Sequence, residues 1–258
     1  MILPHTFDEA SHIYKVENHF VMATSDVVDL NGLGLPPGIP AANREFAGWR
    51  GTQTHRAIQF FEEEVRAGAS VMAAAKAQFN ELNGPLGVIQ PYFMGYLKFR
   101  KDYEFEPIGD LEKQLVYLFG DPNMAIGATI DIRGRIHGHG FQGKPMIGDV
   151  KTATIAHADG NSKDLRQKKL AYRLQTQSYL EATAFDEEWW KLLPQEVVYS
   201  NEYPIKSPSI AGRFIVNPTK GGSYNFFDFS DIDDSRLWHS ACLMAKEKLA
   251  AGIAANRG

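Results

Sequence analysis

The chain of 258 residues has only one cysteine, Cys242, so it cannot form an internal disulfide. It has no apolar run approaching the ~20 residues that a membrane-spanning helix requires. Its N-terminal residues also lack the basic stretch followed by an apolar stretch that is typical of a secretory signal. These absences predict a soluble protein of a reducing cytoplasm, with no membrane partner.

The sequence also lacks a G-x-x-x-x-G-K-[ST] phosphate loop, which excludes a helicase motor of that kind. The net charge is only −4, so neither charge sign dominates. To bind a nucleic acid, the chain would need basic residues concentrated in one place, together with metal ions. We find no internal repeat and no low-complexity tract. The length favours one domain over 1–258, with a hairpin and loop in 1–45 and the core in 46–240.

The most informative stretch, Ile126 to Thr152, places three charged residues on two short apolar runs. The alternating residues are Ile126, Ala128, Ile130 and Ile132 on the first run, and Met146, Gly148 and Val150 on the second. Period-two geometry then turns Asp131, Asp149 and Lys151 away from these apolar faces. The Gly-rich segment from Gly134 to Gly143 is too long for a tight turn, so we expect a long hairpin loop joining antiparallel neighbours.

These residue types suit metal-dependent chemistry on a phosphate. Carboxylates such as Asp131 and Asp149 are the hard oxygen ligands that Mg²⁺ or Mn²⁺ prefers, and the carbonyl of Val150 would face the same space. Lys151 would lie on the same strand face, where its charge can stabilise a phosphate. The combination favours phosphodiester hydrolysis by a metal-activated water, without a covalent intermediate.

Helical periodicity predicts five helices, over Trp49–Ala67, Val71–Leu82, Tyr92–Tyr103, Leu165–Phe185 and Asp234–Ala255. In the first of them, Thr52 or Thr54 would be the cap, which places His55 in the first turn. Short strands are expected over 1–30, with a hairpin at Glu17-Asn18, and at Lys113–Phe119, Val197–Tyr203 and Arg213–Asn217. The Gly- and Pro-rich segment from Leu30 to Ala42 is interpreted as a loop or flap.

The predicted fold is α/β, or α+β, with a central mixed sheet and the helices Thr52–Ala67 and Leu165–Phe185 packed near its active edge. The second of these helices presents Tyr172, Gln175 and Tyr179 on one stripe. Its beginning is the most basic segment of the chain, with Lys163, Arg166, Lys168, Lys169 and Arg173.

Four motifs in order resemble the PD-(D/E)XK nuclease superfamily, specifically its RecB-like exonuclease branch, which includes many phage-encoded members. RGTQTH ending at His55 resembles the helix-borne histidine motif, and IGATID ending at Asp131 resembles the first acidic strand. IGDVKT, from Ile147 to Thr152, resembles the strand with the D-x-K element, and QTQSY, from Gln175 to Tyr179, resembles the Q-x-x-x-Y helix. The order and spacing of these elements extend from about residue 10 to about residue 240.

The resemblance implies a role for each matching residue. Asp131 and Asp149 would be metal ligands, Lys151 the catalytic lysine, and His55 a further metal ligand or a neighbour of a second ion. Gln175 and Tyr179 would orient Lys151 or contact substrate phosphate, and Glu112 resembles the acid that often precedes the first acidic strand. The branch members with an iron–sulfur cluster use four cysteines, so Cys242 alone excludes that cofactor.

The activity implied by the resemblance is that of an Mg²⁺- or Mn²⁺-dependent DNA exonuclease in phage or bacterial recombination, repair or DNA processing. It would work in the bacterial cytoplasm, with a recombination or annealing protein as a candidate partner. Arg50 and the basic residues from Lys163 to Arg173 would then track the DNA backbone. A DNA endonuclease on the same scaffold and a non-catalytic nucleic-acid-binding protein are the alternatives.

Each motif also has a simpler interpretation. Asp131 could pair with Arg133 or Arg135, and Asp149 with Lys151 could form an ordinary surface ion pair. His55 could be a capping or core histidine, while Gln175 and Tyr179 could form a polar seam against the sheet.

Overall fold

The computed structural model describes residues 1–9, 11, 13–34, 38–118, 124–153, 163–193, 199–200, 207–208, 210 and 212–252. Its helices are α1 (Thr24–Leu30), α2 (Ala41–Arg66), α3 (Val71–Glu81), the 3₁₀ helix η1 (Gly84–Ile89), α4 (Gln90–Asp102), α5 (Lys163–Thr183), α6 (Glu187–Trp190) and α7 (Ser235–Ala250). Its strands are β1 (Thr6–Asp8), β2 (Ile13–Val16), β3 (His19–Ala23), β4 (Phe105–Pro107), β5 (Lys113–Leu118), β6 (Ala125–Ile130), β7 (Ile132–Ile136), β8 (Lys144–Val150), β9 (Tyr199–Ser200), β10 (Ser207–Pro208), β11 (Gly212–Pro218) and β12 (Tyr224–Asp228).

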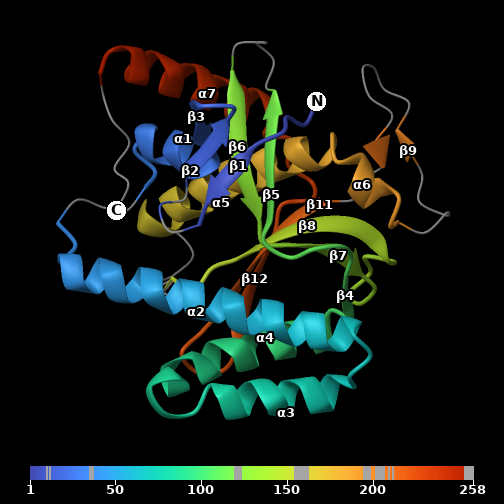
Figure 1. The fold of residues 1–258 in the computed structure, drawn as a ribbon. Helices are drawn as coiled ribbons and strands as arrows, with labels where there is room; N and C mark the ends of the chain where they lie inside the picture. Colours follow the sequence, from blue (N-terminus) through green and yellow to red (C-terminus); the bar gives the residue numbers. More distant parts are fainter. Residues whose placement is uncertain are drawn as a thin grey trace.

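The α+β prediction is confirmed, because helices flank mixed sheets (Figure 1). The expected single central sheet is, however, two five-stranded sheets, with the orders β1-β2-β3-β6-β5 and β12-β11-β8-β7-β4. Each is mixed, since β3 runs parallel to β6 and β11 runs parallel to β8. Within the described ranges, no helix combines the length and the apolar character needed to cross a bilayer.

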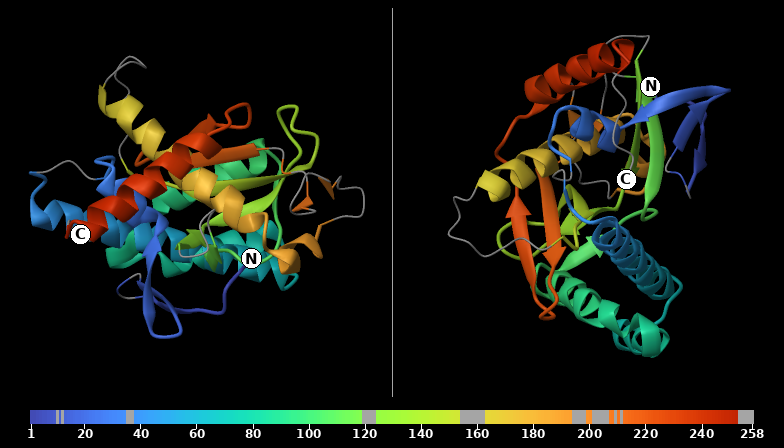
Figure 2. Two further views of the ribbon diagram at one scale, coloured as in Figure 1. Left: turned by 90° about the horizontal axis from the view of Figure 1, so that it is seen from above. Right: turned by 90° about the vertical axis from the view of Figure 1, so that its left-hand side faces the viewer.

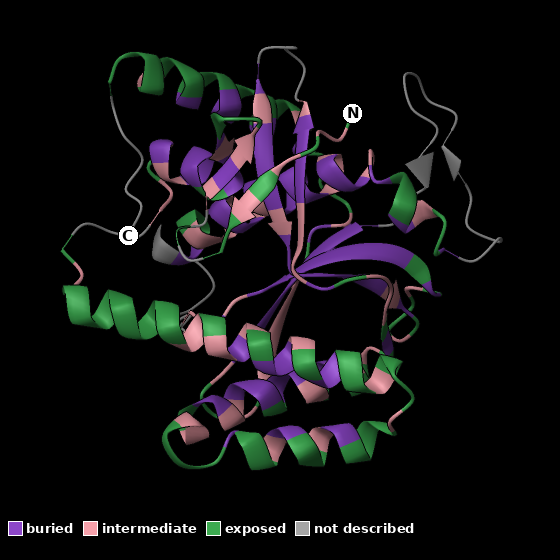
Figure 3. Ribbon diagram, in the orientation of Figure 1, coloured by how far each residue is buried: buried purple, intermediate pink, exposed green. Residues whose placement is uncertain are grey.

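Two hydrophobic cores lie against these sheets. One packs α1, α5 and α7 on β5 and β6, and the other packs α2, α3 and α4 on β7, β8 and β11. Figure 2 shows these two helix groups on different sides of the strands, and Figure 3 shows the central strands as the most buried part of the molecule.

Strand β8 shows the predicted period-two division. Met146 and Val150 belong to the core under α2 and α4, whereas Ile147 belongs to the core under α5. Gly148 lies on the Met146 face, where a Cβ atom would collide with the ring of Phe214, so the backbone approaches that ring closely. Because Asp149 follows the Ile147 face, its side chain points toward α5.

The first apolar run differs from its prediction. It breaks at Asp131 into β6 and β7, which belong to different sheets. Ile130 therefore packs in the core with α5, whereas Ile132 packs in the core with α2 and α4. Strands β7 and β8 are antiparallel neighbours, as predicted. Strand β7 extends to Ile136, so the connecting loop covers only 137–143.

The beginning of the first long helix was also predicted wrongly. Helix α2 begins at Ala41, after Pro40, which offers no side-chain cap. Thr54 is therefore inside the helix, where its hydroxyl donates to the carbonyl oxygen of Arg50 at 2.9 Å, and His55 lies in the middle of α2. The predicted loop from Leu30 to Ala42 is shorter for the same reason, and residues 24–30 form α1 where strand was expected.

The other predicted elements within the described ranges agree with the structure. Helices α3, α4, α5 and α7 and strands β5 and β11 match the expected segments to within a few residues. Strands β2 and β3 form the N-terminal hairpin, and Glu17 has a φ of 54° in its turn. The strand expected at Val197–Tyr203 lies largely outside the described residues, which contain β9 of that stretch.

Candidate active site

The carboxylate of Asp149 is the centre of the candidate site. Its side chain is fully buried at the end of β8 and faces the polar stripe of α5. Oδ1 of Asp149 accepts hydrogen bonds from Nζ of Lys151 at 3.0 Å, from Nε2 of Gln175 at 3.1 Å and from the hydroxyl of Tyr179 at 3.2 Å. Four residues that sequence analysis selected therefore form one hydrogen-bonded group.

The second oxygen of Asp149 is buried and faces the same lysine. Oδ2 lies 2.8 Å from Nζ of Lys151 but has no hydrogen-bond partner among the described residues. Burial, and after it the charge of Asp131, raise the pKa of Asp149 to about 7 against the opposing effect of Lys151. A cation at Oδ2 would compensate this desolvated carboxylate.

Lys151 carries a positive charge in this environment. Burial acts to lower its pKa, but the charges of Asp149 and Asp131 outweigh burial and raise the pKa above its ordinary value. Its side chain is 25% exposed as a whole, while its ammonium group lies against the carboxylate of Asp149. The group is therefore a permanent cation at the edge of the site.

Asp131, at the junction of β6 and β7, joins a second polar group. Its Oδ2 accepts a hydrogen bond of 2.8 Å from the backbone amide of Val150 and lies 3.7 Å from Nε2 of His55. Burial raises the pKa of Asp131, while the charge of His55 lowers it. The break between the two strands places this carboxylate beside the end of β8. The sequence pattern indicated that Asp131 turns away from the apolar face, but it did not indicate the break.

His55 connects α2 to both strands. Its Nε2 lies 2.9 Å from the carbonyl oxygen of Val150, and its Nδ1 lies 2.8 Å from Oε1 of Glu112. Burial acts to lower the pKa of His55, but the carboxylates of Asp131 and Glu112 outweigh it and raise the pKa to about 10. The carbonyl of Val150 thus points into the site, as predicted.

Glu112 is brought into the site by a local backbone feature. It has a φ of 51°, and its amide nitrogen donates to the carbonyl oxygen of Asp131 at 3.0 Å. This hydrogen bond fixes the register of Glu112 relative to the acidic strand, which the sequence alone does not indicate. The side chain of Glu112 is 26% exposed, and its Oε1 pairs with Nδ1 of His55.

Three of these side chains could hold a metal ion. Ligand atoms of His55, Glu112 and Asp131 lie within 4.8 Å of one another. The carbonyl oxygen of Val150, 2.9 Å from Nε2 of His55, adds an oxygen donor of the kind that Mg²⁺ and Mn²⁺ prefer, whereas Asp149 does not belong to that cluster. A proton on Nε2 of His55 would have to leave before that nitrogen could ligate a metal.

The predicted basic residues are placed differently from one another. Arg173 is held by the carboxylate of Asp234, so its guanidinium group has a structural partner. Lys169 lies over the ring of Phe227 at 5.5 Å. Arg166 is exposed and Lys168 is half-buried, while the side chain of Lys163 lies outside the described residues.

Sequence analysis missed Asn217, which supports the end of β8. Its side-chain amide donates to the carbonyl oxygens of Lys151 and Ala153, the latter at 2.9 Å. Arg50 acts on the same segment, because its Nη2 donates to the carbonyl oxygen of Thr152 at 3.0 Å. The sequence signal that could have identified Asn217 is its position as a polar residue near the end of the buried strand β11.

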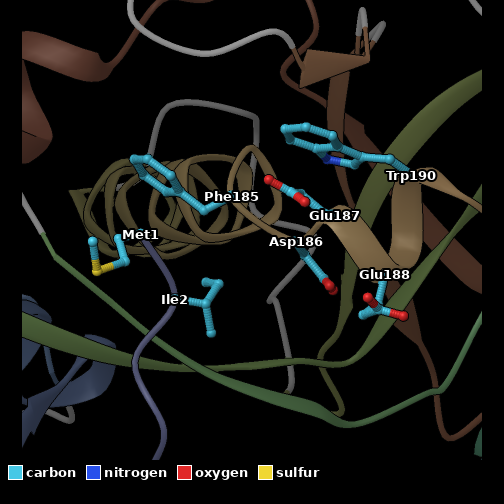
Figure 4. Close-up of a pocket in the computed structure, with 7 residues that line it drawn as sticks. All are labelled: Met1, Ile2, Phe185, Asp186, Glu187, Glu188 and Trp190. Atoms are coloured by element: carbon cyan, nitrogen blue, oxygen red, sulfur yellow. The ribbon is translucent and has the colours of Figure 1, made fainter.

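A separate cavity of about 680 Å³ contains none of the predicted site residues. Residues of the N-terminal segment and of the region around α6 line it (Figure 4): Met1, Ile2, Phe185, Asp186, Glu187, Glu188 and Trp190. Asp186 forms a buried ion pair with Arg133, with 2.6 Å between Oδ2 and Nη1. That carboxylate therefore has a structural function.

Comparisons with known proteins leave the family open. No protein-family model matches this sequence, and no curated protein matches it. A solved structure titled "Crystal structure of SSO0001" aligns with a TM-score of 0.38 and 10% sequence identity, over 92% of this chain and 79% of that chain. Similarity at this level carries no function over, so the function has to be inferred from the residues of this chain.

Proposed function

We propose that this protein is an Mg²⁺- or Mn²⁺-dependent deoxyribonuclease that hydrolyses phosphodiester bonds. The observation that carries the proposal is the buried carboxylate of Asp149. Its Oδ2 has no hydrogen-bond partner in the described structure, and the ammonium group of Lys151 lies 2.8 Å away. A buried carboxylate paired with a lysine places opposite charges side by side, as the binding of a metal ion and a phosphate group requires.

His55, Glu112, Asp131 and the carbonyl of Val150 would hold the ion, with Asp149 as the further ligand that the resemblance implies. When bound, Mg²⁺ or Mn²⁺ withdraws electron density from a phosphoryl oxygen and makes water more acidic. The first two side chains are about one quarter exposed and Asp131 and Asp149 are buried, so solvent reaches this group of donors from one side. Substrate would have to enter from that side.

Lys151 would stabilise the charge that develops on the phosphate. An ammonium group has three N–H donors, and Oδ1 of Asp149 accepts one of them in the described structure. The remaining donors can bind a phosphate oxygen at the exposed edge of the site. Gln175 and Tyr179 would keep the Asp149 carboxylate in one orientation, so Lys151 would be held ready for substrate.

The resemblance to the RecB-like branch favours an exonuclease that acts on DNA in phage or bacterial recombination, repair or processing. Such an enzyme would work in the bacterial cytoplasm beside a recombination or annealing protein. Arg50, Arg166 and Lys168 would contribute to the contact with the DNA backbone.

The test is degradation of labelled DNA by the purified protein with Mg²⁺, with Mn²⁺ or with EDTA. Linear single-stranded, linear double-stranded and covalently closed circular DNA are compared. Metal-dependent release of nucleotides from linear DNA alone supports an exonuclease, while cutting of the circle supports an endonuclease. No degradation of any form with either metal contradicts the proposal.

A further inference from the structure

The first part of α2 extends beyond the body of the molecule. Residues 41–49 are all exposed, whereas the second half of the helix contributes Ala57, Ile58 and Phe61 to a core. Figures 1 and 3 show this exposed end projecting past α3 and α4. Gly48 and Gly51 lower its intrinsic helix stability further. Packing within the described structure therefore does not explain why this segment is helical.

Two aromatic rings lie on the projecting segment. Phe46 is 50% exposed and Trp49 is 37% exposed, and their rings stack with centroids 5.7 Å apart at an interplanar angle of 27°. The guanidinium group of Arg50 lies 5.9 Å from the centre of the Phe46 ring and 5.1 Å from that of Tyr92. Flat, exposed π surfaces thus lie beside a cation, and we call Phe46, Trp49 and Arg50 the α2 strip.

The α2 strip is connected to the candidate active site. Nη2 of Arg50 donates to the carbonyl oxygen of Thr152, next to Lys151, and its buried Nε has no partner among the described residues. His55 follows Trp49 by six positions on the same helix. At ~1.5 Å and ~100° per residue, the two are separated by about 9 Å along the helix axis and by about 120° around it. The axial separation alone corresponds to two or three stacked nucleotides, at ~3.4 Å each.

The charge of this helix segment suits a polyanion. Between Ala41 and Phe61 the chain carries Arg44, Arg50 and Arg56 against one acid, Glu45, whereas the end of α2 adds Glu62, Glu63 and Glu64 before Arg66. Arg56 reaches Glu9 at 3.3 Å, so Arg44 and Arg50 supply the positive charge nearest to the exposed rings. The whole chain is acidic, with a net charge of −4, so this basic and aromatic segment is a local exception.

We propose that the α2 strip binds a single strand of DNA by stacking unpaired bases on Trp49 and Phe46, while Arg50 binds the adjoining phosphate. Stacking requires free base faces, which a single strand offers and the interior of a duplex does not. The inference rests on the proposed function, because the strip would hold the strand that enters the candidate active site. It specifies a substrate with an unpaired end.

The test measures DNA binding without hydrolysis, by fluorescence anisotropy of short labelled oligonucleotides in EDTA. Trp49→Leu and Phe46→Leu retain apolar bulk but remove the ring, and Trp49→Tyr retains a ring. We expect each leucine variant to bind the single strand roughly tenfold more weakly than wild type and Trp49→Tyr to bind close to wild type. Binding of a blunt duplex should change much less.

Phe20→Ala is the matched control, because Phe20 is also an exposed phenylalanine beside a cation, with Nζ of Lys15 at 4.9 Å. It should leave binding unchanged. Equal affinity of wild type and the leucine variants, an equal loss in Trp49→Tyr or Phe20→Ala, or no single-strand binding by wild type would each overturn the inference. Binding is measured without metal, so it is judged separately from nuclease activity: ring-dependent binding by an inert protein refutes only the proposed function.

Discussion

The hydroxyl group of Tyr179 donates a hydrogen bond of 3.2 Å to Oδ1 of Asp149, 30 positions earlier in the chain. The same hydroxyl accepts a hydrogen bond of 2.6 Å from Nε2 of Gln175. One face of α5 therefore fixes a carboxylate on β8, and the helix and the strand have to be packed together for the site to exist. Substitutions of the α5 residues that hold this carboxylate should therefore change the rate of DNA cleavage.

Tyr179→Phe should lower the rate of metal-dependent DNA cleavage by roughly 10- to 100-fold, the usual effect of losing a group that orients a ligand. Asp149 would keep its hydrogen bonds from Lys151 and Gln175, so activity should fall without disappearing. The rate is measured on linear DNA, and thermal unfolding confirms that the variant is folded. Wild-type activity in a folded variant would show that Tyr179 does not position Asp149.

Glu112→Gln should weaken Mn²⁺ binding by roughly 10- to 100-fold. The substitution keeps an oxygen that can contact Nδ1 of His55 but removes one negative charge from the cluster. Isothermal titration calorimetry measures the affinity. Glu104→Gln, at an exposed acid in the turn after α4, is the control and should bind like wild type. Unchanged affinity in Glu112→Gln would exclude Glu112 from the metal site.

Asp234→Ala should lower the free energy of unfolding by about 3–5 kcal/mol, because it leaves buried positive charge without a partner. Asp234 is 1% exposed, lies 2.8 Å from Nη2 of the buried Arg213, and also pairs with Arg173. Urea denaturation measures the change. Asp231→Ala, at an exposed neighbour, should stay within about 0.5 kcal/mol of wild type. Similar stabilities for both variants would contradict the assignment of this ion pair.

Glu181→Gln should remove part of the pH dependence of stability. Burial raises the pKa of Glu181 to about 7, partly opposed by the hydrogen bond from Gln177. Because the folded-state pKa exceeds the ordinary value of 4.5, the contribution of Glu181 to stability is present below that value and is lost as the pH rises through 7. The loss is at most about 3 kcal/mol, at ~1.4 kcal/mol per pKa unit.

The measurement for Glu181 is the free energy of unfolding of wild type and Glu181→Gln at pH 5 and at pH 8. Wild type should lose more stability than the variant between these two values. Equal pH dependence in the two proteins would mean that Glu181 titrates normally in the folded state.

Much of the site could be predicted from the sequence because its determinants are local. The alternation along β8 separates Met146 and Val150 from Asp149, and the three- and four-residue spacing on α5 aligns Gln175 with Tyr179. The resemblance implied that Gln175 and Tyr179 orient Lys151 or contact substrate phosphate, and in the structure both donate to Asp149.

The rest depends on tertiary structure. The start of α2 has no side-chain cap and its first residues meet no core, so neither capping nor apolar periodicity marks them. The break at Asp131 interrupts an alternation that continues without change in the sequence, because the two halves face different cores. The place of Glu112 depends on a left-handed backbone conformation and on one hydrogen bond to Asp131.

The central claim is tested most directly by the rate of nucleotide release from end-labelled linear DNA with Mn²⁺, in wild type, Asp149→Asn and Lys151→Ala. The predicted result is release by wild type that EDTA abolishes and that both variants lose by several orders of magnitude while remaining folded. If folded Asp149→Asn or Lys151→Ala released nucleotides at the wild-type rate, the end of β8 would not be the catalytic centre. If wild type released none, the protein would not be a nuclease of this kind.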